Sequence, residues 1–452
     1  MPRWMADLLA DYGMALVLLL LGALFSVATL GEQSPAGEVA ARQIAELLQQ
    51  RSPAGGRVLL VGRAQADDAA FADRLATLLR TTRWEVVDAV QGEPSDARRR
   101  LETLAAEGAT LDVVACSPAA AGWRIFADLP QLAEGGRPVE VVRPRPLRRP
   151  SFLKPENLLN ISNQIAVIAI VAVGMTLVII TGGIDLSVGS LIALSAVLTT
   201  RLIRDAAGGT DASALGMALA SAAAMAVCGA SGAFSALMIT RCGIPPFIVT
   251  LAMMLVGSGA AYMLSQGESI AAVPESFVWL GRGANRWGLP HAVVLMFGLY
   301  VAAHLAMSRM KIGRYLYAVG GNREAARLSG VPVEPAVVFA YVACGLLAGL
   351  GGVVLASQLK SGSATYGAMY ELYVIAAVVV GGASLSGGEG KMFGTLIGAF
   401  VIAVIQNGMN LTGVESYTQK IVLGLVILGA VLLDQLRSRR FARTAQDGLA
   451  RP

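Results

Sequence analysis

The sequence predicts an all-α polytopic membrane protein with about ten transmembrane helices, plus a small α/β soluble insertion in which a parallel sheet is flanked by helices. Apolar windows of roughly 20 residues, long enough to span a bilayer, recur along most of the chain. Only 15% of the residues are charged, whereas soluble domains carry about 25%. One polar stretch, residues 31–150, interrupts this pattern with alternating strand-like and helix-like segments.

The apolar windows give the predicted spans in order. We interpret the first as an uncleaved membrane helix, because no obvious small-residue cleavage pattern follows it. The eighth window is short and depends on its neighbours. The windows lie near residues 13–30, 163–181, 186–203, 212–239, 246–265, 290–307, 334–357, 371–382, 393–411 and 418–436.

The polar stretch has the pattern of a small α/β domain. The run RVLLVG at Arg57–Gly62 is typical of a buried strand, and an amphipathic helix near Asp67–Arg80 follows it. Continued alternation of strands and helices implies a parallel sheet covered by helices. A basic, proline-rich linker at Pro144–Pro155 then leads into the second span. The remaining predicted elements are strands at Trp84–Val90, Leu111–Cys116 and Val139–Val142 and a helix at Ser95–Glu107.

The distribution of basic residues predicts the orientation, because cytoplasmic loops carry an excess of Lys and Arg. We expect an N-terminus and first span at 1–30, an extracytoplasmic insertion at 31–150, a transmembrane core at 151–437 and a cytoplasmic tail at 438–452. The basic residues of the linker count against this orientation, because the linker would lie outside. Long translocated domains, however, weaken the rule that basic loops are cytoplasmic. The residues concerned are Arg309, Lys311, Arg314, Arg323 and Arg327 after the sixth span, Arg437, Arg439, Arg440 and Arg443 in the tail, and Arg143, Arg145, Arg148, Arg149 and Lys154 in the linker.

An apolar run breaks at Gly182-Gly183, and Asp185 and Ser187 follow at once. In lipid such a break is tolerated only where protein or a water-filled path satisfies the freed backbone groups. Asp185 and Ser187 are therefore candidates for a solute pathway; the alternative is that the carboxylate caps the next helix. The same pattern, Gly-Gly-x-x-Leu-Ser-x-Gly, recurs at residues 381–388, either by chance in a glycine-rich chain or as an internal repeat.

Three more polar residues in or beside predicted spans are pathway candidates. Glu371 opens the eighth window, where it could form an external gate contact or complement the helix dipole. Gln406 and Asn410, at i and i+4, share one helix face and suit a hydroxyl-rich solute. Interhelical hydrogen bonding is the alternative for this pair.

The sequence predicts no catalytic or metal site. The four cysteines lack a metal-ligand spacing, and no Ser-His-Asp set or paired carboxylates stand out. Gly390-Lys391 is followed by Met392, so this run is not a P-loop, which needs Ser or Thr there. We therefore expect no ATP hydrolysis by this chain. We expect membrane lipid and no nucleic acid among its partners, because no basic patch interleaved with aromatic residues is present.

Five motifs follow one another in the second part of the chain: ENLLNI (156–161), VGMTLVIITGGIDLSVGS (173–190), GIPPFIVTLAMM (243–254), GRYLYAVGGNREAARLSGV (313–331) and VVVGGASLSGGEGKMFGTLIGA (378–399). In order and spacing they resemble the permease subunit of ribose-type ABC importers. The resemblance implies a homo- or heterodimer of permease subunits in the bacterial cytoplasmic (inner) membrane. Two cytoplasmic ABC ATPase subunits holding ATP-Mg would drive transport, and an extracytoplasmic sugar-binding protein would deliver a monosaccharide or similar small polar solute. This chain would bind no cofactor itself.

The segment 311–332 matches the family's coupling element, which docks into the ATPase. The residues agree, because Asn322 or the glycines before it can start a short helix over Arg323–Ser329 that Gly330 and Pro332 bound. An ordinary loop between spans is the alternative. The predicted coupling residues are Gly320, Gly321, Asn322, Arg323, Glu324, Ala325 and Arg327.

Two other function classes stay open from the sequence. An ion- or proton-coupled secondary transporter would use Asp185 or Glu371 and would need no ATPase. A membrane receptor would sense through residues 31–150, but nothing like an output module follows the spans. The insertion is faintly similar to the N-terminal lobe of periplasmic sugar-binding proteins, with Cys116-Ser117-Pro118 at a strand end, and we predict a docking or scaffold role for it.

Overall fold

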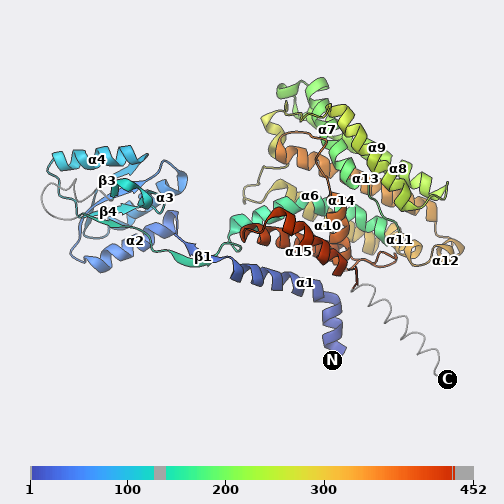
Figure 1. Ribbon diagram of the computed structural model, residues 1–452, viewed down its shortest axis with the longest axis horizontal. Coiled ribbons are helices and arrows are strands. Elements are labelled where there is room, and N and C mark those ends of the chain that lie inside the picture. Colours follow the sequence, from blue (N-terminus) through green and yellow to red (C-terminus); the bar gives the residue numbers. More distant parts are fainter. Residues whose placement is uncertain (1–2, 127–138, 430, 433–452) are drawn as a thin grey trace. The chain divides into compact units, whose positions relative to one another are not determined.

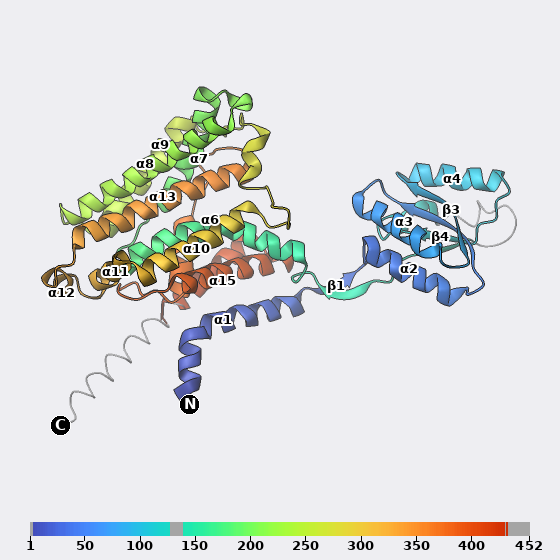
Figure 2. The same cartoon turned by 180° about the vertical axis from the view of Figure 1, so that it is seen from behind.

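The structure is a computed structural model that describes residues 3–126, 139–429 and 431–432, with side chains from residue 13 onward. The chain divides into two compact units. Unit 1 comprises Met1–Thr29 and Ser151–Pro452, and unit 2 comprises Leu30–Pro150. In Figures 1 and 2, unit 1 is the helical part and unit 2 is the part that contains the four-stranded sheet.

Unit 2 is a parallel sheet between two layers of helices, which confirms the predicted parallel sheet. The strands have the order β3-β2-β4-β5 and all run parallel. Side chains of β2 alternate between two apolar cores: Val58 and Leu60 pack with α2 and α3, whereas Leu59 and Val61 pack with α4. The elements are α2 (Gly37–Arg51), β2 (Gly56–Gly62), α3 (Ala66–Leu79), β3 (Trp84–Gln91), α4 (Pro94–Ala106), β4 (Val113–Cys116), η1 (Ala120–Gly122), η2 (Arg124–Phe126) and β5 (Glu140–Val142).

A two-stranded ribbon closes unit 2 where the sequence predicts only a linker. β1 (Leu30–Gln33) pairs antiparallel with β6 (Leu147–Pro150). The interpretation of Pro144–Pro155 as a linker alone is therefore wrong for β6. The ribbon joins residues more than 100 positions apart, which a local pattern cannot reveal.

Unit 1 is a helical bundle in which six of the described helices are long and apolar enough to cross a membrane. These are α6, α8, α9, α10, α13 and α15. The count of about ten spans remains a prediction beyond these six. The helices are α1 (Arg3–Ala28), α6 (Pro155–Ile180), α7 (Val188–Ala206), α8 (Ala214–Thr240), α9 (Pro246–Ser265), α10 (His291–Arg309), α11 (Lys311–Gly321), α12 (Arg323–Leu328), α13 (Val333–Leu359), α14 (Tyr370–Val380), α15 (Met392–Leu411) and Ser416–Gly429, with 3-10 turns η3 (Gly209–Asp211) and η4 (Glu275–Trp279).

The helix α6 forms the centre of unit 1. In its most apolar stretch 89% of the residues are buried, against 22% for α9. It lies between α13 and α15 in both views (Figures 1 and 2) and also packs against α10 and α14. Small residues permit the close approach: a Cβ added at Gly174 of α6 would lie 2.6 Å from the Cα of Cys344 in α13. The C-terminal end of α6 is therefore held firmly at the point where the Gly182 turn begins.

Candidate functional site

The short helix expected in the coupling segment is present as α12. Asn322 is its N-cap, and the Asn322 Oδ1 accepts hydrogen bonds from the amides of Glu324 (3.1 Å) and Ala325 (2.9 Å). Gly330, with a φ of 80°, follows the helix in a left-handed conformation, which favours glycine. The sequence signals at both ends of this helix are local, which is why they could be recognised.

One face of α12 is open to solvent. Ala326 is 5% exposed and packs inward, whereas Arg323, Glu324 and Arg327 are exposed. Leu328 is 83% exposed, the highest value among the exposed large apolar side chains of the described residues. Sequence reasoning missed Leu328, because the pattern does not show which way the last residue of a short helix points. A single exposed apolar side chain is common on protein surfaces. Leu328 is a candidate docking contact because it stands beside these charges at the end of the expected coupling helix.

The coupling segment touches the turns that follow α6 and α14. A Cβ added at Gly320 would overlap the Ile180 carbonyl oxygen and would lie 2.5 Å from the Gly388 nitrogen. The Gly388 amide donates a hydrogen bond to that same carbonyl oxygen at 2.9 Å. The Tyr317 hydroxyl, one turn earlier in α11, donates to the Gly390 carbonyl oxygen at 2.7 Å. We call this contact of Gly320 with Ile180 and Gly388 the glycine junction.

The two copies of the Gly-Gly motif meet in the junction. Gly182 (φ 78°) and Gly382 (φ 89°) are both left-handed, and each ends an apolar helix. The amide of Gly182 donates to the Ile179 carbonyl oxygen, and the amide of Gly382 donates to that of Val379, both at 2.9 Å. The left-handed glycine is the first of its pair in one copy and the second in the other. Because many helices end with a left-handed glycine, this geometry does not set an internal repeat apart from chance.

Asp185 lies in the turn between α6 and α7 and is 1% exposed. Its Oδ1 accepts hydrogen bonds from the Ser187 amide (2.9 Å) and the Ser187 hydroxyl (2.6 Å). Ser187 is the N-cap residue of α7. Asp185 Oδ2 is buried and has no hydrogen-bond partner among the described residues. The carboxylate thus holds the residue at which α7 starts, through the amide and hydroxyl of Ser187 rather than through an amide of α7 itself.

The variant Asp185→Leu is expected to lower the free energy of unfolding by about 1–3 kcal/mol for each donor left unpaired, because Ser187 loses its acceptor inside the protein. Asp185→Asn keeps the Oδ1 acceptor and is expected to retain most of that stability. Thermal unfolding of the purified variants in detergent measures both. Equal losses would show that the negative charge, rather than the acceptor, is required.

Glu371 lies in the first turn of α14, against α7. A Cβ added at Gly189 would overlap the Glu371 carboxylate. Because α14 has 11 residues, at 1.5 Å each Glu371 is about 15 Å from the junction end of that helix, roughly half the thickness of a bilayer core. Glu371 is half-buried and packs against the start of α7, one length of α14 away from the junction.

Gln406 and Asn410 belong to another part of the bundle. Asn410 is the penultimate residue of α15, and its Oδ1 accepts a hydrogen bond from Gln419 Nε2 at 2.7 Å. Asn407 forms two reciprocal hydrogen bonds with Asn157 of α6, at 2.9 and 3.0 Å. At 1.5 Å per residue, Asn410 is about 27 Å from the start of α15, where the junction lies. The structure does not bring this pair together with Asp185.

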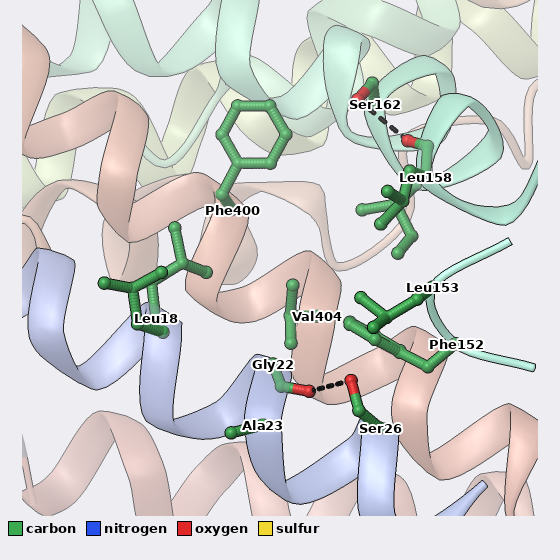
Figure 3. A pocket seen from close by; sticks show the side chains of 12 residues that line it. Leu18, Gly22, Ala23, Ser26, Phe152, Leu153, Leu158, Ser162, Phe400 and Val404 are labelled. Atoms are coloured by element: carbon green, nitrogen blue, oxygen red, sulfur yellow. Dashed lines mark hydrogen bonds between the residues drawn. The ribbon is translucent and has the colours of Figure 1, made fainter. Parts of the chain in front are cut away.

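An apolar groove of about 430 Å³ lies between α1, α15 and the start of α6 (Figure 3). The hydroxyls of Ser26 and Ser162 in its lining donate to carbonyl oxygens of their own helices, Gly22 at 2.6 Å and Leu158 at 2.9 Å. The other labelled side chains are apolar. This groove suits a lipid acyl chain and is not a candidate path for a polar solute.

Among the described residues, no group of three or more His, Cys, Asp or Glu side chains could hold a metal ion. Burial raises the pKa of the Cys116 thiol, so this cysteine is unreactive. Ser117, at the end of β4, donates a hydrogen bond to the buried Asp68 at 2.9 Å. The strand end at Cys116-Ser117-Pro118 is therefore occupied by a contact within unit 2.

The family model that matches this chain covers unit 1 after its first helix. The family model described as "Branched-chain amino acid transport system / permease component" matches residues 157–431. The ribose import permease protein of Escherichia coli strain K12 is 43% identical over 289 residues, 63% of this chain and 87% of the relative. The D-allose and L-arabinose transport system permease proteins of the same strain are 34% and 35% identical, each over 64% of this chain and 86% of the relative. No solved structure matches the chain.

Proposed function

The chain belongs to the permease-component family of branched-chain amino acid transport systems, and on that premise we propose that it carries a monosaccharide or similar small polar solute across the membrane as the permease subunit of an ABC importer. Sugar permeases for ribose, allose and arabinose are its relatives. Family membership favours this function over an ion-coupled secondary transporter or a receptor. The observation that supports it best is α12, a capped helix with an exposed apolar and charged face.

The subunit would act in an assembly. Two cytoplasmic ABC ATPase subunits would hold ATP-Mg and dock on α12, and a second permease subunit would complete the pathway. An extracytoplasmic sugar-binding protein would deliver the solute at the opposite membrane surface. In this proposal the protein would lie in the bacterial cytoplasmic membrane with residues 31–150 outside, where unit 2 would serve as a docking or scaffold domain.

The glycine junction gives this proposal a mechanical route. When ATP binding closes the ATPases, α12 is displaced and α11 moves with it. The contact of Gly320 with Ile180 and Gly388 would pass this movement to the turns after α6 and α14 at the same time. Asp185 and Ser187 would keep the first turn rigid, and Glu371 remains a pathway candidate beside the start of α7.

Affinity purification of the tagged full-length chain from native membranes in mild detergent, followed by mass spectrometry, tests the proposed function. A co-purifying ABC ATPase is the expected result. Repeated preparations of a stable permease without any ATPase would contradict it and would lead to gradient-driven uptake assays.

Charge reversal on α12 is expected to weaken coupling. Arg323→Glu and Glu324→Arg should each reduce solute uptake by up to about fivefold, because exposed ion pairs are worth up to about 1 kcal/mol. Uptake of radiolabelled sugar in cells, normalised to permease in the membrane, measures this. Arg286→Glu, in the exposed loop before α10, is the matched control. Normal uptake by both α12 variants would rule out a role of these charges in docking.

A further inference from the structure

Residues 361–369 connect α13 to α14 without forming a helix. Lys360 (φ 55°) and Met369 (φ 68°) take left-handed conformations at the two ends of this segment, which are rare for residues with a side chain. The following helix, α14, has only 11 residues, about 16 Å at 1.5 Å per residue. A spanning helix needs about 30 Å. About half of the crossing is therefore left to non-helical backbone.

This segment runs along α7. A Cβ added at Gly362 would lie 2.5 Å from the Ala196 carbonyl oxygen, and one added at Gly367 would lie 2.5 Å from the Gly189 carbonyl oxygen. The two contact points are about 10 Å apart along the helix. The segment starts beside the loop between α9 and α10, because Gly362 and Ile270 exchange backbone hydrogen bonds of 2.8 and 2.9 Å. From there it follows α7, which packs against α8 and α13, both long enough to cross a membrane.

One side of the segment is exposed. Gly362, Ala364 and Gly367 are buried against the bundle, whereas Thr365 and Ala368 are exposed. Irregular backbone facing lipid does not occur in the hydrocarbon core, because lipid cannot satisfy its amide and carbonyl groups. The exposed side must therefore face water or another protein chain.

The polar groups of the segment suit a polyhydroxylated solute. The hydroxyl oxygens of Ser363 and Thr365 are 2.9 Å apart, and those of Ser361 and Tyr366 are 2.5 Å apart. In the first pair one hydroxyl donates to the other, which leaves one O–H donor and lone pairs for a further partner. In the second pair the Ser361 hydroxyl also donates to the Leu359 carbonyl oxygen, so this pair offers lone pairs only. Hydroxyl groups combined with backbone groups at a break in a helix match the way transporters bind solutes near the bilayer centre.

We propose that residues 361–369 line the solute pathway, and that the Thr365 hydroxyl and the backbone beside it hydrogen-bond the hydroxyl groups of a monosaccharide. This inference rests on the proposed transport function and names the part of the chain that meets the solute. It also assigns the exposed side of the segment to the water-filled space between the two permease subunits.

Cysteine accessibility in the full-length protein tests the inference. The substitution Cys242→Ser removes the exposed native thiol, while Cys116, Cys228 and Cys344 are buried. In that background, Thr365→Cys and Ala368→Cys would be treated in native membranes with a charged thiol reagent. Val227→Cys, 44% exposed in the spanning helix α8, is the matched control. We expect Thr365→Cys to react about a hundredfold faster than this control, because lipid excludes the charged reagent.

Added D-ribose, D-allose or L-arabinose should slow the reaction of Thr365→Cys, and the completed reaction should block uptake. If Thr365→Cys and Ala368→Cys both react no faster than Val227→Cys, the pathway assignment is wrong. Fast reaction that no sugar slows and that leaves uptake intact would overturn the contact with solute. If sugar protects Thr365→Cys but no ATPase co-purifies, the ABC assignment is wrong and the pathway assignment still holds.

Discussion

Replacing Leu328 with glutamine is expected to release the ATPase from the permease, lowering their association constant by about tenfold to a hundredfold. Leu328 is 83% exposed at the end of α12, and docking would bury it. Burial of a leucine side chain is worth about 1.5–3 kcal/mol, and each 1.4 kcal/mol is about tenfold in affinity. The amount of ATPase that co-purifies per permease, titrated against added ATPase, measures the change.

Leu328→Met is the matched control for this experiment, because it keeps an apolar side chain of similar volume. It should retain the ATPase, whereas Leu328→Gln should not. The charges of Arg323 and Glu324 should contribute less, and their contribution should fall as salt is added. Undiminished ATPase binding by Leu328→Gln would show that α12 docks through its charges alone or does not dock.

Local signals account for most of what the sequence predicts correctly. Asn322 and Gly330 are recognisable because a cap and a left-handed turn depend on residues within one helical turn. The strand Arg57–Gly62 is recognisable because four buried apolar residues follow one another in it. In contrast, α2 (Gly37–Arg51) was not predicted. Three of its six buried residues are alanines, which give a weak helical period.

Contacts between distant segments account for what the sequence does not reveal. The packing of Gly320 against Ile180 and Gly388 joins three parts of the chain, and nothing in the neighbourhood of each glycine indicates its partner. The segment 361–369 has a weak signal, since the eighth apolar window is too short to span. The short window indicates that part of this crossing is not helical. Only the structure shows that the non-helical part runs along α7.

Gly320→Ala is expected to reduce solute uptake by tenfold or more while the ATPase stays bound. The added methyl group would lie between the Ile180 carbonyl oxygen and the Gly388 amide, and would separate the hydrogen-bonded pair that joins the two repeated turns. Loss of coupling between two sites typically costs about fivefold to 150-fold. Uptake of radiolabelled sugar and co-purification of the ATPase, measured on the same membranes, distinguish lost coupling from lost assembly.

The next residue offers a closely matched control. A Cβ added at Gly321 would meet no atom within 4 Å, so Gly321→Ala adds the same methyl group to the same helix without touching the junction and should transport normally.

Tyr317→Phe removes the hydrogen bond to the Gly390 carbonyl oxygen without adding volume, so it weakens the contacts around the junction even if Gly320→Ala fails to fold. We expect uptake by Tyr317→Phe to fall by about fivefold, at the lower end of typical coupling losses. Equal uptake by Gly320→Ala and Gly321→Ala would contradict a transmitting role for the junction. Because the three side chains lie within one and a half turns of each other, their different effects would come from the contacts and not from their place in the helix.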